Sequence, residues 1–310
     1  MRKIVPFICL TIILGGCSMS TKNQEIESKN KENIILGQGD IELNSNEFVR
    51  VQDYNGDGYT LRDSENTKAI LSGKHGLIER AVEKYFLTKH ETPVIVHNIL
   101  PAKDGATVFV ESFGEPHFYT YAVVPVDIKS KKIDTDSIFT QEGVIESAIT
   151  SSLYAMMYEK EFKNLDNYLE EIATTNPVTG LPLQVVERVK GNGYSNSFYF
   201  VDVSAKYNKD PYLAFIENPN ISKEELLNKF ADYFDPKHIS IGITLYMKED
   251  GQEPDEELYN KIVEDIKQKD DIPSGSYALI LHDNLINKVV ANATKKNSIK
   301  KTVTNMILKE

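Results

Sequence analysis

The stretch that decides the fold is residues 94–126, with the sequence VIVHNILPAKDGATVFVESFGEPHFYTYAVVPV. It contains runs rich in β-branched and aromatic residues, and the turn-forming sequences Lys-Asp-Gly and Gly-Glu-Pro separate these runs. We therefore predict strands over residues 94–100, 107–112 and 118–126. Because tight turns join consecutive strands in antiparallel order, the stretch indicates an antiparallel sheet.

The segment before this sheet has the periodicity of an amphipathic helix. Its apolar residues recur at helical spacing ahead of Pro93, and they are Leu77, Ile78, Ala81, Val82, Tyr85 and Phe86. Side chains at this spacing lie on one face of a helix. A helix followed by closely connected strands is typical of a sheet with a helix packed on it.

The rest of the chain predicts a second set of elements. A long helical stretch from about Glu142 to Thr174 is expected to join the two halves. The expected strands are 48–52, 198–204, 239–247 and 277–282, and the other expected helices are 222–234, 255–269 and a basic terminal helix over 294–309. We predict an α+β fold in two lobes, each an antiparallel or mixed β-sheet packed with helices, joined by a long helix.

The N-terminus has the pattern of a lipoprotein signal peptide. A positively charged start precedes an apolar run over residues 4–14, which is too short to cross the membrane because spanning about 30 Å of hydrocarbon needs about 20 residues. The run ends in LGGC, residues 14–17, which is the pattern of a lipobox. We expect cleavage before Cys17, a diacylglyceryl group on its thiol, and anchoring by two or more lipid chains.

These patterns divide the chain into four parts. Residues 1–16 are the signal peptide, which is removed, and residues 17–46 are the lipidated Cys17 with a polar tether that is too poor in apolar residues to fold. Residues 47–135 form the expected N-terminal α+β lobe. Residues 136–310 form the expected helical connector and C-terminal α+β lobe.

Charge and cysteine content exclude several classes of function. The formal net charge is −11, and removal of the signal peptide takes two more positive charges, so we expect no nucleic acid as a partner. Cys9 leaves with the signal peptide and lipid consumes Cys17. The mature chain then has no free thiol for a disulfide, a thiolate metal site or a cysteine nucleophile.

The chain resembles a known family in several short sequences. Besides LGGC at 14–17, these are VQDY at 51–54, GYTL at 58–61, KDGAT at 103–107 and FYTY at 118–121. They are similar to an uncharacterised lipoprotein family of low-GC Gram-positive bacteria, the domain of unknown function 1672. The resemblance covers most of the mature chain. It implies a location at the membrane and no activity, because the family has no assigned reaction.

The segment DYNGDG, residues 53–58, matches the start of a calcium-binding loop. Asp53, Asn55 and Asp57 supply oxygens at positions 1, 3 and 5, and a glycine follows at position 6. Position 12, where a bidentate glutamate is expected, is Ser64. We therefore expect a tight turn, since Asn-Gly and Asp-Gly are preferred there, and no cofactor. The alternative is a calcium site with Asp53, Asn55 and Asp57 as its ligands.

His97, Glu111 and His117 fall on successive expected strands and could converge on one face of the sheet. Such a group could hold a metal ion or transfer protons. The sequence has no His-Glu-x-x-His pairing, so we expect each histidine to be an ordinary surface or core residue and keep the shared site as the alternative. A further loop, residues 191–197, is either a hairpin turn or part of a ligand groove.

No catalytic residue is assigned, because the sequence has no nucleophile elbow, phosphate-binding loop or dinucleotide-binding motif. We expect a surface lipoprotein anchored at the extracytoplasmic face of the cell membrane through Cys17. Its expected function is the non-enzymatic binding of a protein, a peptide or an envelope polymer. The alternatives are an envelope hydrolase with an unfamiliar site and a calcium-stabilised scaffold or adhesion module.

Overall fold

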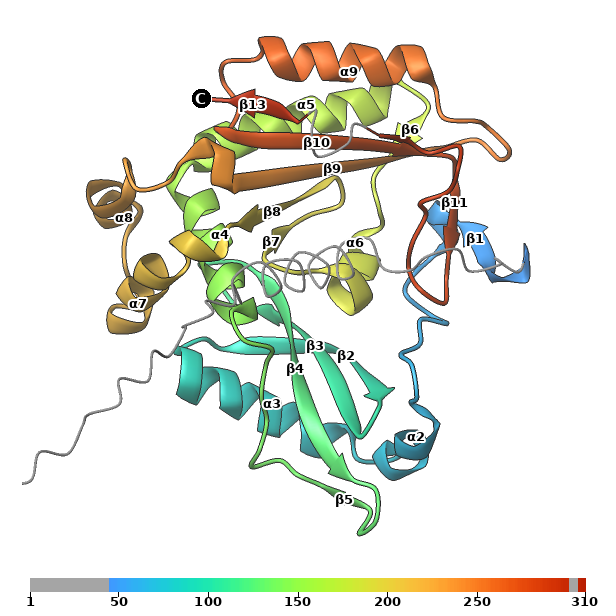
Figure 1. The fold of residues 1–310 in the computed structure, drawn as a ribbon, viewed down its shortest axis with the longest axis vertical. Helices are drawn as coiled ribbons and strands as arrows, with labels where there is room; N and C mark the ends of the chain where they lie inside the picture. The colour runs from blue at the N-terminus through green and yellow to red at the C-terminus, as the bar shows by residue number, and fades with distance from the viewer. Residues whose placement is uncertain (1–44, 301–305) are drawn as a thin grey trace, which may run out of the picture. The chain divides into compact units, whose positions relative to one another are not determined.

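Two large β-sheets with helices packed on them make up most of the described part of the chain (Figure 1). The computed structural model describes residues 45–300 and 306–310. The expected signal peptide and Cys17 lie outside the described residues. The mixture of sheets and helices confirms the predicted α+β fold class. In the described residues, no helix is both long enough and apolar enough to cross a membrane.

The first sheet is antiparallel and contains the stretch that decides the fold. In spatial order its strands are β2 (Val94–Ala102), β3 (Gly105–Ser112), β4 (Tyr119–Asp127) and β5 (Lys132–Ile133). Helices α2 (Glu65–Leu71) and α3 (His75–His90) pack on this sheet. Their shared core includes Ile78, Val82 and Phe86 from α3 and Ala106, Val108 and Val110 from β3. The predicted sheet with a helix on one face is confirmed.

The second sheet is mixed. In spatial order its strands are β12 (Ile299–Lys300), β10 (Gly275–His282), β9 (Ile239–Met247), β8 (Tyr199–Val203) and β7 (Tyr194–Ser195), with β6 (Val178–Thr179) paired to β9 and β13 (Ile307–Lys309) paired to β10. β9 and β10 run parallel and are joined through α9 (Glu256–Gln268). Helix α9 and helix α5 (Glu159–Thr175) share one core with this sheet (Figure 1).

The helical connector consists of two consecutive helices. Helix α4 (Val144–Met157) ends at Tyr158, whose φ of −109° and ψ of 35° interrupt the helix before α5 begins. Ile149 and Leu153 of α4 lie in the core of the first sheet, while Tyr154 lies in the core of the second. The prediction of a helical connector is confirmed, and the predicted continuity from 142 to 174 is wrong because the chain changes direction at Tyr158.

The C-terminal segment does not form the predicted terminal helix. Instead, β12 and β13 both pair antiparallel with β10, with Leu281 opposite Ile299 and Tyr277 opposite Ile307. Residues 301–305 lie outside the described residues. The helical pattern of the sequence does not determine the structure here. Strand pairing is favoured because the edge of β10 offers backbone hydrogen bonds and because Ile307 is buried in the core of the second sheet.

The remaining elements are short. Strand β1 (Phe48–Arg50) pairs antiparallel with β11 (Leu285–Asn287). Helix α6 (Leu183–Val185) continues into η3 (Val186–Lys190), a π-helical turn that contacts β2 and β3. The others are η1 (Ser45–Glu47), η2 (Val51–Asp53), η4 (Ala205–Tyr207), α7 (Lys209–Glu217), α8 (Lys223–Phe230) and η5 (Pro236–His238). Ser222 caps α8 in a capping box with Glu225, as the predicted start at 222 requires.

Candidate functional site

The first sheet brings His97, Glu111 and His117 together, and we call them the His–Glu–His cluster. Nε2 of His97 lies 2.6 Å from Oε2 of Glu111, and Nε2 of His117 lies 2.7 Å from Oε1 of the same carboxylate. The hydroxyl of Tyr119 donates a longer hydrogen bond, 3.4 Å, to Oε1. The structure therefore brings together three residues whose convergence is only the alternative from sequence, which favours ordinary surface or core positions for the histidines.

A β-bulge in β2 places His97. Val96 pairs with Val110 and Asn98 pairs with Phe109, so His97 is an extra residue with no partner across the ladder. A bulge bends its strand and redirects a side chain. The side-chain Nδ2 of Asn98 donates to the backbone carbonyl of Arg188 in η3, which holds the bulge against that turn.

The backbone around His117 is held from several sides. Oγ of Ser112 accepts a hydrogen bond from the Phe118 amide and donates one to the Pro116 carbonyl. From α4, Oγ of Ser152 donates to the His117 carbonyl over 2.6 Å. Hydrogen bonds from the sheet, the turn and helix α4 therefore fix the backbone position of His117.

The carboxyl of Glu111 is held in its ionised form. Burial by itself raises its pKa, but the hydrogen bonds from His117 and His97 outweigh burial and lower the pKa below its usual value. An ionised carboxylate only accepts hydrogen bonds, so both imidazoles donate from Nε2. Burial, with the charges of Glu111 and Glu187, raises the pKa of the Tyr119 hydroxyl and keeps it protonated.

The cluster is open to solvent on one side and has an apolar rim. The side chains of His97 and Glu111 are each 19% exposed and that of His117 is 33% exposed. Ile95, opposite Glu111 across the ladder, is 44% exposed, and Phe113 at the following turn is 70% exposed. A ligand can therefore reach charged and aromatic groups at the same place.

The candidate calcium ligands are arranged as a turn held by an arginine. Oδ1 of Asn55 accepts from the Asp57 amide, and its Nδ2 donates to Oδ2 of Asp57. The guanidinium of Arg188 bonds Oδ1 of Asp57 and the Asn55 carbonyl. Asp53 instead lies 4.0 Å from Nε of Arg50. Within residues 45–300 and 306–310, no three His, Cys, Asp or Glu side chains are arranged to hold a metal ion.

We expect millimolar Ca²⁺ to raise the melting temperature of the ion-free protein by less than about one degree. The reason is that Ser64 replaces the bidentate glutamate and Arg188 already neutralises Asp57. A native site at 100 times its dissociation constant would instead add about 2.7 kcal/mol. Thermal melting with and without Ca²⁺ measures the difference. A rise of several degrees that disappears in Asp53→Ala with Asp57→Ala would establish the calcium loop.

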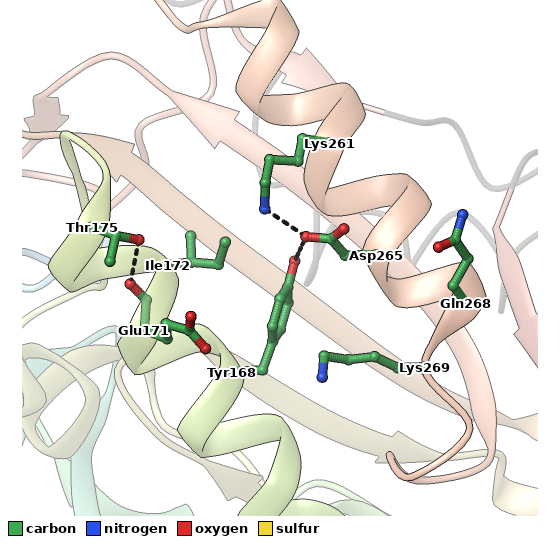
Figure 2. Close-up of a pocket in the computed structure, with 8 residues that line it drawn as sticks. All are labelled: Tyr168, Glu171, Ile172, Thr175, Lys261, Asp265, Gln268 and Lys269. Carbon is green, nitrogen blue, oxygen red and sulfur yellow. Dashed lines mark hydrogen bonds and ion pairs between the residues drawn. The ribbon is translucent and has the colours of Figure 1, made fainter.

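A groove of about 350 Å³ lies between α5 and α9 (Figure 2). In it, the ammonium of Lys261 and the hydroxyl of Tyr168 both donate to Oδ2 of Asp265, over 2.7 and 3.0 Å. The ammonium of Lys269 lies 4.9 Å from the centre of the Tyr168 ring. These groups satisfy one another across the two helices, so the groove is the weaker candidate for a site. Sequence reasoning missed it because its residues come from two exposed helix faces.

The loop at residues 191–197 is held against β4 and α4 by hydrogen bonds. The Gly193 amide donates to the Tyr119 carbonyl, and the Tyr119 amide donates to the Gly193 carbonyl. The amide of Tyr194 donates to Oγ of Ser151 in α4. The loop therefore connects the two sheets and feeds β7, which agrees with the hairpin interpretation.

Comparisons with known proteins identify similar sequences of unknown function. The family model described as "Protein of unknown function (DUF1672)" matches residues 42–309. A crystal structure of a DUF1672 family protein from Staphylococcus aureus subsp. aureus Mu50 is similar in fold, with a TM-score of 0.63 and 17% identity over 85% of this chain and 98% of that chain. The search of curated proteins finds no match.

Proposed function

Because the chain belongs to the DUF1672 family, whose function is unknown, we propose from its own residues that it is a lipid-anchored binding protein. It is held at the extracytoplasmic face of the cell membrane through Cys17. It presents the His–Glu–His cluster and its apolar rim to a protein, a peptide or an envelope polymer. It binds without catalysing a reaction.

The lipobox supports the anchor. LGGC at residues 14–17 follows a short apolar run, and the family match begins at residue 42, which leaves a polar segment between the two. A segment of that composition serves as a tether. The folded body would then stand clear of the lipid headgroups.

We expect Cys17→Ser to abolish lipid labelling and leave the chain unprocessed, because serine has no thiol for the diacylglyceryl group. Growth with labelled palmitate, followed by membrane fractionation, measures the loss. Cys9→Ser is the matched control and should label like the wild type, since Cys9 lies within the removed segment. Undiminished labelling of Cys17→Ser would mean that the lipobox assignment is wrong.

The single observation that carries the binding role is an ionised carboxylate held by two imidazoles beside an exposed aromatic ring. Aromatic residues are enriched in binding surfaces, and Phe113 is 70% exposed without filling a core. Histidines add hydrogen-bonding groups that are already fixed in position. The surface therefore combines apolar contact area with directional polar contacts.

Crosslinking of the membrane-anchored protein in intact cells tests this role. A photoreactive amino acid at Phe113 should give a defined adduct with an envelope component, and His117→Gln should weaken that adduct. The matched control is the same photoreactive residue at Leu213, which is 42% exposed on α7. Equal crosslinking from both positions, or an adduct that is unchanged in His117→Gln, would show that the cluster does not form the binding surface.

The pairing of Glu111 with an imidazole favours one second candidate, an envelope hydrolase. A carboxylate that orients a histidine is the usual support of a general base. Turnover of purified envelope polymer by the protein, lost in His97→Gln and His117→Gln, would favour hydrolysis over binding.

A further inference from the structure

We propose that the His–Glu–His cluster binds one divalent transition-metal ion, of the class that includes Zn²⁺. The ligands are Nε2 of His97, Nε2 of His117 and the carboxylate of Glu111. This inference deepens the proposed function at the same site. It rests on the proposed function in one respect, which is that the anchored protein meets metal ions at the outer face of the membrane.

The ligand chemistry fits this class of ion. Zn²⁺ is bound by imidazole nitrogen and carboxylate oxygen, and sites with two histidines and one glutamate leave a position for water or a further ligand. Hard ions such as Mg²⁺ prefer an all-oxygen shell. The two imidazoles therefore select a transition metal over Mg²⁺ or Ca²⁺.

Both imidazoles already point their ligating Nε2 atoms at the Glu111 carboxylate, each at a different oxygen. The two Nε2 atoms lie 2.6 and 2.7 Å from the oxygens of one carboxylate. With metal–ligand bonds of about 2.0 to 2.2 Å, neighbouring ligand atoms stand about 3.3 Å apart. Each Nε2–oxygen distance must therefore open by roughly 0.6 to 0.7 Å, and the carboxylate must turn so that one ion can reach both imidazoles.

This movement accounts for the absence of a ready metal cage among the described residues. In the ion-free state the two Nε2 protons hold the cluster together by hydrogen bonding to Glu111. On binding, the metal takes the place of these protons. An Nε2 atom that binds the ion carries no proton, so each displaced proton moves to Nδ1 of its ring or leaves to solvent.

The surroundings of the cluster favour a cation. The carboxylate of Glu115 lies beside His117 and accepts its backbone amide over 3.1 Å. Glu187 is close enough to Tyr119 to help raise the pKa of its hydroxyl. The nearby Arg188 guanidinium is engaged by Asp57 and the Asn55 carbonyl. Tyr119 supplies the outer hydrogen bond to Glu111 that commonly orients a metal ligand.

Isothermal titration of the detergent-solubilised, chelator-treated lipoprotein with ZnCl₂ tests the proposal, with MgCl₂ as the hard-ion control. We expect one Zn²⁺ per chain and no comparable binding of Mg²⁺. His97→Gln, His117→Gln and Glu111→Gln should each weaken Zn²⁺ binding by at least about tenfold, since each removes a ligand. Unfolding curves without metal establish that each variant is folded.

The matched control is His75→Gln, which removes an exposed histidine at the start of α3. It should leave Zn²⁺ binding unchanged. Absence of Zn²⁺ binding by the wild type, or binding that survives both cluster histidine substitutions, would overturn the metal site. Palmitate labelling of Cys17 is independent of both results, so a failure of the metal site and a failure of the anchor can be told apart.

Discussion

Gly191→Ala is expected to lower the free energy of unfolding by about 2 to 3 kcal/mol, because the added methyl group has no room. A Cβ at this position would lie 2.5 Å from Cβ of Tyr119, 2.6 Å from its Cγ and 2.8 Å from the carbonyl oxygen of Val186. The Val186 carbonyl also accepts the Gly191 amide over 2.6 Å. Neither the Val186 carbonyl nor the Tyr119 side chain can make room for the methyl group unless η3 moves away from β4.

The matched control is Gly76→Ala near the start of α3. There the added Cβ meets only the guanidinium end of Arg80, at 3.4 Å. Alanine also restricts the unfolded chain, so this variant should keep or slightly raise stability, by up to about 1 kcal/mol. Urea unfolding of both variants gives the comparison. Similar stability of Gly191→Ala and the wild type would show that Tyr119 is not tightly packed against η3.

The same contact links stability to the candidate site. Tyr119 is buried, lies opposite Glu111 across the ladder and hydrogen-bonds its carboxylate. Displacement of Tyr119 in the Gly191→Ala variant should therefore disturb the His–Glu–His cluster through this hydrogen bond. No property of Gly191 in the sequence indicates this, because the close approach is between the end of η3 and β4, which lie far apart along the chain.

Local patterns predicted the elements whose residues carry their own signals. The β-branched and aromatic run of β3, the Ser222 cap of α8 and the apolar run of β9 each indicate one kind of element, and the structure has that element at each place. The C-terminal segment was predicted wrongly because its lysines and spaced apolar residues suit a helix in isolation. Its pairing with β10 depends on an open edge that only the folded sheet provides.

The candidate site also has a part that the sequence could predict and a part that it could not. His97, Glu111 and His117 could be proposed as a group because each lies on a predicted strand of one small sheet. The bulge at His97 could not be predicted, because the residues of β2 have no turn-forming glycine there and the irregularity depends on pairing with β3. The support from Ser152 is also invisible in sequence, since it comes from α4, 35 residues further along the chain than His117.

Acidification from about pH 6.5 to about pH 4 is expected to destabilise the protein by several kcal/mol, because two histidines are held uncharged in the fold. Burial, with a smaller effect of Lys295, lowers the pKa of His282 to about 4. Burial, with a smaller effect of Lys89, lowers the pKa of His90 to about 4. His282 is the more deeply buried of the two, with 3% of its surface exposed.

The direction follows from proton uptake. In the unfolded chain both histidines take up protons as the pH falls below about 6.5, whereas in the fold they do so only near pH 4. Between these values the unfolded state binds more protons, so stability falls as the pH falls. The contribution of His282 is on the order of 3 kcal/mol, and that of His90 is smaller because its ring is partly exposed.

Urea unfolding at intervals from pH 7 to pH 4 measures this loss, and His282→Gln identifies its source. Nδ1 of His282 lies 2.8 Å from Oγ of Ser298, so glutamine retains a polar group but cannot take up the proton. The variant should start less stable at pH 7 and lose less stability on acidification than the wild type. His75→Gln should keep the wild-type slope, since His75 is exposed. Equal slopes for His282→Gln and the wild type would mean that His282 is not held uncharged by the fold, and the loss between about pH 6.5 and about pH 4 would then have to come from His90. Glu111 cannot replace them, because its lowered pKa makes stability fall only below the usual carboxyl pKa.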